Sequence, residues 1–361
     1  MGQFWKVLNL DGEETLGHWG KLGEVICWGP PAALNARLTT LRIPPIDEIV
    51  RPYPDLKAAP IPNEKKTHMD FRASRLRWLE RKEQNSRLLD LPEDILREIF
   101  GQLRGLAPVV LLSCTCQALW SLGRHFIYAL IVSRARSRSW QGHRLICVGD
   151  YLQKKDIPAG LLSPEEEQRF LAPHEDWDSD DYGALYSYPF RQVRSDPGAP
   201  GMSRWREEGA DEYTHVAWAV RDLLPALVDL HRDFFDENQV RENPAAFVLR
   251  NLTKRVYVRG TAVAELRAKY TGTSVPMERL TLGEVVLPRI CLSSFGGMSL
   301  AYGDTELDLH RGEWAGDRFD VVWVEDGLEW IDVAEEDGKV WKDVGAEVLD
   351  LVEKIWVAEF E

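Results

Sequence analysis

Apolar residues recur at helical spacing between residues 88 and 103, in the stretch LLDLPEDILREIFGQL. The chain places these residues on one helical face and its charged residues on the opposite face. The apolar set is Ile95, Leu96, Ile99, Phe100 and Leu103. Pro92, followed by two acids, is typical of a helix start, because proline lacks an N–H that would be unpaired there. The pattern predicts a helix from Leu91 or Pro92 whose apolar face something must cover.

A second apolar run, PVVLLSCTCQALWSLG, follows a few residues later. Gly105 and Pro108 interrupt the chain, so we expect a second short helix over Val109–Cys116 and a third over Gln117–His125. Helices this short supply more apolar surface than they can bury among themselves. The run contains polar residues and ends in a basic pair, so we do not expect it to span a membrane.

The order of these apolar positions resembles the F-box of fungal proteins. F-box proteins are substrate receptors of cullin-RING ubiquitin ligases, in which three helices dock on a Skp-type adaptor and the rest of the chain holds a protein target. The resemblance therefore implies these adaptor-binding residues: Leu91, Pro92, Ile95, Leu96, Ile99, Phe100, Leu103, Leu112, Cys116 and Trp120. The alternative is that the helices pack only into this protein's own core. Gly105 and the apolar Pro108-Val109-Val110 depart from the usual pattern.

Segments on both sides of this motif are similar to a class of uncharacterised fungal proteins, some without an F-box. They include MGQFWKVLNLD, HRLICVGDYL and RGEWAGDRFDVV. This implies an α+β fold in which a three-helix F-box is inserted into a mixed body. We expect residues 1–35 to supply the N-terminal strands of the body, 36–87 a proline-rich linker and a charged helix, 88–130 the F-box, and 143–361 the main body.

Local patterns predict the following elements of the body. We expect strands at QFWKVLNL, EVICW, KRVYVR, EVVLPRICLSS and RFDVVWVED, and a turn at GHWGKLGE. We expect helices at VAWAVRDLLPALVDLHRDFF, NPAAFVLRNL, TAVAELRAKY and Val344–Phe360. The sequence shows no internal repeat of the kind found in leucine-rich or propeller receptors.

Charge is distributed unevenly along the chain. Arg and Lys outnumber Asp and Glu between residues 36 and 142, whereas the whole chain has a net charge of −14. Because the acidic remainder would repel phosphate, we interpret the basic stretch as a solvated helix rather than a nucleic-acid site. The five cysteines include no CxxC pair, and the first residues resemble no secretion signal. We therefore expect a cytoplasmic or nuclear protein with reduced thiols, no cofactor and no metal.

The acidic stretch HEDWDSDDY raises a second function. The flanking segments faintly resemble fungal arginine-containing cyclodipeptide synthases, which use aminoacyl-tRNA and carry a DDxxE motif. Asp180-Asp181 does not meet that motif, because Ala184 stands where Glu is required, and residues 325–329 are a looser match. Under this alternative a cation or arginine pocket would include Asp176, Asp178, Asp180, Asp181, Glu325, Asp326 and Glu329. The other interpretation is that these acids form a solvated loop without a ligand. The sequence predicts no catalytic residue.

Overall fold

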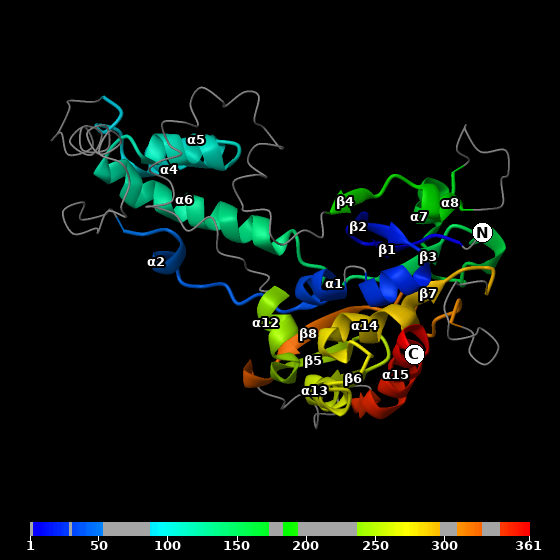
Figure 1. Ribbon diagram of the computed structural model, residues 1–361. Helices are drawn as coiled ribbons and strands as arrows, with labels where there is room; N and C mark the ends of the chain where they lie inside the picture. The colour runs from blue at the N-terminus through cyan, green and yellow to red at the C-terminus, as the bar shows by residue number, and fades with distance from the viewer. Residues whose placement is uncertain are drawn as a thin grey trace, which may run out of the picture. The chain divides into compact units, whose positions relative to one another are not determined.

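The computed structural model describes residues 3–28, 31–52, 87–172, 183–193, 237–296, 309–326 and 340–361. These residues belong to two compact units. One unit, called here the body, comprises Met1–Thr40, Ser139–Gly198 and Phe235–Glu361, and the other, called the helical unit, comprises Leu41–Arg138 and Ala199–Phe234. The chain contains helices and mixed sheets, so it is of the α+β class (Figure 1).

The first sheet of the body joins strands from distant parts of the chain. Its order is β4-β2-β1-β3-β7, and its strands are β1 Trp5–Asn9, β2 Glu14–Gly20, β3 Leu145–Gly149, β4 Arg191–Val193 and β7 Cys291–Leu292. Strand β1 lies between β2 and β3 and is antiparallel to both, whereas β3 and β7 are parallel (Figure 1). The N-terminal strands therefore gain their partners from residues after Arg144.

The second sheet has the order β8-β5-β6-β9. Its strands are β5 Phe247–Asn251, β6 Val256–Arg259, β8 Phe319–Trp323 and β9 Lys342–Asp343. Strand β5 is antiparallel to both β6 and β8. The turn after β5 is held by the Asn251 side chain, whose Oδ1 accepts hydrogen bonds from the backbone N–H groups of Thr253 and Lys254 at 3.1 and 3.0 Å.

Short helices surround the sheets of the body. The α-helices are α1 Pro31–Leu38, α7 Pro164–Phe170, α8 Ala184–Ser187, α12 Glu237–Glu242, α13 Gly260–Lys269, α14 Leu282–Val286 and α15 Gly345–Phe360. Segment η1 Glu24–Trp28 is a π-helix. The 3-10 helices are η2 Lys154–Asp156, η3 Pro244–Ala246, η4 Met277–Arg279, η5 Leu287–Ile290 and η6 Val324–Asp326. The closing helix α15 buries Val352, Ile355 and Trp356 completely in the main core.

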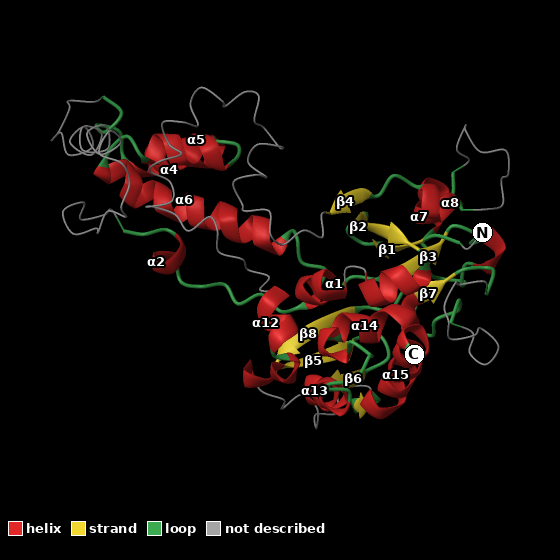
Figure 2. Ribbon diagram, viewed as in Figure 1, coloured by secondary structure: helices red, strands yellow, loops and turns green. Residues whose placement is uncertain are grey.

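The helical unit consists of helices joined by loops (Figure 2). Its helices are α2 Ile46–Ile49, α4 Glu93–Gln102, α5 Leu106–Ser113 and α6 Gln117–Arg136. They share one apolar core, formed by Ile49, Val50, Phe100, Val109, Val110, Leu119, Trp120, Leu122 and Ile127. The third helix is longer than predicted, because the amphipathic pattern continues past His125 through buried Ile127, Val132 and Ala135.

Several predicted elements are confirmed. The strands expected at QFWKVLNL, KRVYVR and RFDVVWVED are β1, β6 and β8, and the helices at TAVAELRAKY and Val344–Phe360 are α13 and α15. The helix expected over residues 216–235 and the charged helix before residue 87 lie outside the described residues.

Four predictions were wrong. EVICW forms the π-helix η1, and the first half of GHWGKLGE, residues 17–20, belongs to β2 rather than to a turn. NPAAFVLRNL contains the strand β5, whose side chains are buried on both faces of the sheet, so the sequence shows no alternation that would have revealed a strand. EVVLPRICLSS begins as α14, where Thr281 and Glu284 form a capping box, and only Cys291 and Leu292 are extended.

Candidate functional site

Helix α4 presents apolar side chains to solvent. It begins at Glu93, and Glu93 and Asp94 lie in its first turn as the sequence indicated. Leu91 is 38% exposed and Ile95 is 48% exposed. Ile99, one turn after Ile95, is half-buried. Because the body and the helical unit bury most of their large apolar residues, this exposed strip is a candidate for covering by a partner.

Two predicted adaptor-binding residues lie inside the helical unit instead. Phe100 and Trp120 are each 1% exposed. The ring of Phe100 stacks on Phe126 at 5.3 Å, and the indole N–H of Trp120 donates to the backbone oxygen of Arg51 at 3.1 Å. These side chains hold the unit together and cannot contact a partner while it keeps this fold.

The other predicted positions lie at the edge of the same core. Pro92 is exposed at the start of α4, and four further residues are half-buried. These are Leu96, Leu103, Leu112 and Cys116. The structure therefore brings the ten positions into one unit but separates them into residues that pack inward and residues that reach solvent.

The segment expected as an extended linker partly packs on α6. Tyr128 donates its hydroxyl hydrogen to the backbone oxygen of Pro44 at 2.9 Å. Arg124 forms an ion pair with Asp47 and donates to the backbone oxygen of Val50 at 2.9 Å. The proline content of this segment suggested an extended chain, but Ile49 and Val50 are completely buried. Their burial comes from packing on α6, which lies more than 60 residues later in the sequence.

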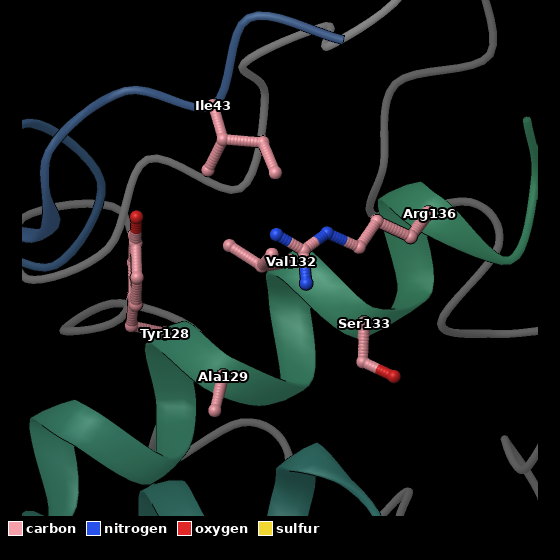
Figure 3. Close-up of a pocket in the computed structure, with 6 residues that line it drawn as sticks. All are labelled: Ile43, Tyr128, Ala129, Val132, Ser133 and Arg136. Atoms are coloured by element: carbon pink, nitrogen blue, oxygen red, sulfur yellow. The ribbon is translucent and has the colours of Figure 1, made fainter. Parts of the chain in front are cut away.

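The structure describes a pocket of about 500 Å³ beside the second half of α6, which sequence reasoning missed. It is lined by Ile43, Tyr128, Ala129, Val132, Ser133 and Arg136. The guanidinium of Arg136 extends back toward Val132 and Ile43, whereas the Ser133 side chain points away from Ile43 (Figure 3). The site thus combines an apolar lining with one cation.

A second missed feature is an aromatic patch on the body. Phe4, Tyr151 and Phe295 are 39–46% exposed and are the exposed aromatic side chains of the described residues. Tyr151 and Phe295 meet edge to face, with ring centroids 6.1 Å apart. The patch forms because the first residues of β1 lie beside the last residues of β3, and β7, which is parallel to β3, ends at the same end of the sheet.

Hydrogen bonds hold the three segments of the aromatic patch in place. The backbone of Phe4 and residue Asp150 exchange two hydrogen bonds, at 2.9 and 3.1 Å. Gln3 donates to the backbone oxygen of Phe295 at 2.6 Å and accepts from Ser293 at 2.6 Å. These contacts hold the backbone segments that carry the rings before any partner arrives, which lowers the entropy cost of binding.

Comparison of the chain with protein-family models, curated proteins and solved structures found no match. The site is therefore interpreted from its own residues.

The acidic residues predicted as a cation pocket are not brought together in the described part of the chain. Asp176, Asp178, Asp180, Asp181 and Glu329 lie outside the described residues. Glu325 and Asp326 are exposed in η6. Of the residues that the structure describes, no three His, Cys, Asp or Glu side chains lie close enough to hold a metal ion.

The five cysteines are present as free thiols. Burial raises the pKa of Cys27 and of Cys114 to about 12, so both keep their protons at neutral pH. Cys147 and Cys291 face each other across β3 and β7 and are completely buried. Where the chain is described, none of its helices has the length and apolar character needed to cross a bilayer.

Proposed function

We propose that this protein is an F-box substrate receptor. Its helical unit docks on a Skp-type adaptor of a cullin-RING ubiquitin ligase, and its α+β body binds a protein target. In this proposal the F-box, at about residues 88–130, is inserted between the first strands of the body and the rest of it.

The exposure of Leu91 and Ile95 is the observation that carries the proposal. Both lie on the strip that the F-box resemblance assigns to the adaptor, and both remain exposed after α4 has packed Phe100 inward. Among the described residues, Leu91 just before α4 and Ile95 within it leave much of their apolar surface in contact with water, which is unfavourable. Burying the part of each side chain that is still exposed against a partner would contribute about 1 kcal/mol per residue, roughly half of the value for a fully exposed side chain.

The aromatic patch supports target binding through the body. Aromatic side chains are enriched at the energetic centres of protein interfaces, because they bury a large area with few rotatable bonds. Phe4, Tyr151 and Phe295 meet this description and are held by the hydrogen bonds given above. They lie on the body, so a target bound there would contact different residues from those that an adaptor would contact on α4.

The proposal predicts that Ile95→Asp weakens adaptor binding. The full chain is purified with a Skp-type adaptor, and affinity is measured by titration calorimetry. We expect a loss of at least about tenfold, because a charge would be buried in an apolar interface. Thermal stability should stay near that of the wild type, because Ile95 is exposed.

Val324→Asp serves as the matched control, since Val324 is an exposed apolar residue of the body. It should bind the adaptor like the wild type. If the wild-type chain forms no complex with the adaptor, or if Ile95→Asp binds unchanged, the receptor proposal is wrong and the helices serve only this protein's own packing.

A further inference from the structure

The end of α6 is basic in an otherwise acidic protein. Residues 99–149 contain no Asp or Glu, although the chain has 58 acids and a net charge of −14. Arg134 and Arg136 lie in the last turn of α6, and Arg138 follows two residues after the helix ends. Of the described residues that line the pocket beside α6, Arg136 carries a positive charge and none carries a negative charge, which favours an anionic partner.

The pocket itself offers one cation above an apolar lining. Val132 is buried, and Ile43 and Tyr128 are half-buried. The Tyr128 hydroxyl already donates to Pro44, so the ring and not the hydroxyl faces a ligand as an apolar wall. Arg136 is exposed, and among the described residues it has no ion pair or hydrogen bond partner on its side chain. Figure 3 shows its guanidinium over the pocket.

We propose that this pocket docks an acidic peptide segment of a partner protein. An aliphatic side chain of the segment enters between Ile43, Tyr128 and Val132, and a neighbouring carboxylate pairs with Arg136. The volume of about 500 Å³ suits one aliphatic side chain and adjacent backbone. Guanidinium binds carboxylate through two parallel hydrogen bonds, which gives the contact a defined direction.

The observations favour a peptide over a nucleic acid. A nucleic-acid strand requires several cations along its backbone and aromatic faces on which bases stack. The pocket lining supplies one guanidinium, and its one aromatic residue, Tyr128, is only half-buried beside aliphatic neighbours. An apolar side chain beside a carboxylate uses both parts of the site. The proposal is independent of adaptor binding, because Leu91 and Ile95 do not line the pocket.

The test measures fluorescence anisotropy with the full chain and a fluorescein-labelled peptide that places one leucine among Asp and Glu residues. One matched probe replaces the acids by Asn and Gln, and another replaces the leucine by serine. The protein variants are Arg136→Gln and Ile43→Ser. Arg104→Gln is the control, because Arg104 is also exposed in the acid-free stretch but does not line the pocket.

We expect Arg136→Gln, Ile43→Ser and either altered probe to weaken binding by about five- to tenfold, whereas Arg104→Gln leaves it unchanged. The altered probes keep the test decisive should a protein variant fold poorly. The proposal is overturned if the acidic peptide does not bind, or if Arg104→Gln weakens binding as much as Arg136→Gln. Tighter binding of an oligouridylate than of the peptide would also overturn it, in favour of a nucleic-acid site.

Discussion

Gly260→Ala is expected to lower the free energy of unfolding of the body by about 3 kcal/mol or more. A Cβ at this position would lie 1.8 Å from the backbone oxygen of Pro244 and 2.7 Å from that of Phe247. Both neighbours are backbone atoms, so neither can rotate away as a side chain would. Phe247 also begins β5, which lies between β8 and β6, so a backbone shift there would disturb the hydrogen bonds of the second sheet.

Urea denaturation of the full chain, followed by tryptophan fluorescence, measures this effect. Gly101→Ala is the matched control, because Gly101 is also a helical glycine but a Cβ there has no neighbour within 4 Å. Alanine is favoured over glycine within a helix by about 1 kcal/mol, so this control should leave stability equal or slightly higher. A Gly260→Ala protein that unfolds at the wild-type urea concentration would show that the backbone at Pro244 adjusts freely.

Glu284→Gln is expected to stabilise the body above neutral pH. Burial is the main cause that raises the pKa of Glu284 to about 7, from an ordinary value of 4.5. Between these two pH values the folded protein holds a proton that the unfolded chain has released. The free energy of unfolding therefore falls as pH rises through this window, by about 3 kcal/mol in total. Glutamine cannot ionise, and its side-chain oxygen can still accept from the backbone N–H of Thr281 as Glu284 does at 2.7 Å.

The measurement is the free energy of unfolding from about pH 5 to pH 8 for wild type and variant, because the difference between the two curves removes other titrating groups. The variant should match the wild type near the acidic end and exceed it by up to about 3 kcal/mol at the alkaline end. Arg267 and Cys27 interact electrostatically with Glu284 and are unchanged in both proteins. Glu265→Gln, which removes an exposed acid of α13, is the control for the loss of one negative charge from the body. Parallel curves for Glu284→Gln and wild type would mean that Glu284 is ionised in the folded body.

The amino-acid sequence by itself determined the elements whose pattern is local. The helix α4 follows from its apolar spacing and its Pro-Glu-Asp start, and α15 follows from a long amphipathic period. The strand β8 was also predicted, from the short apolar run in RFDVVWVED. Each of these signals comes from residues within one or two turns of each other, so no distant contact is needed to recognise them.

Tertiary structure alone decided which of the predicted site residues reach solvent. Helical spacing places Ile95 and Phe100 at opposite margins of the apolar face of α4, roughly 140° apart, and Ile95 is 48% exposed whereas Phe100 is 1% exposed. The difference arises because α5 and α6 form one core that includes Phe100, whose ring stacks on Phe126. Gly123 shows how closely they pack, since a Cβ there would lie 1.9 Å from the Ser113 hydroxyl oxygen. The spacing of apolar residues in the sequence does not reveal how closely Gly123 and Ser113 approach each other.

The remaining surfaces exist only because distant segments meet. Phe4, Tyr151 and Phe295 come together through the strand order of one sheet, and Ile43 joins Arg136 because the chain before α4 folds back on α6. Neither group of residues can be recognised in the sequence, because its members are far apart in the chain. Strand pairing and helix packing depend on the whole buried core rather than on neighbours in the chain. The sequence thus determined the local elements and their amphipathic faces. The packing inside each unit determined the surfaces on which the proposed function depends, because these surfaces join segments that are distant in the sequence.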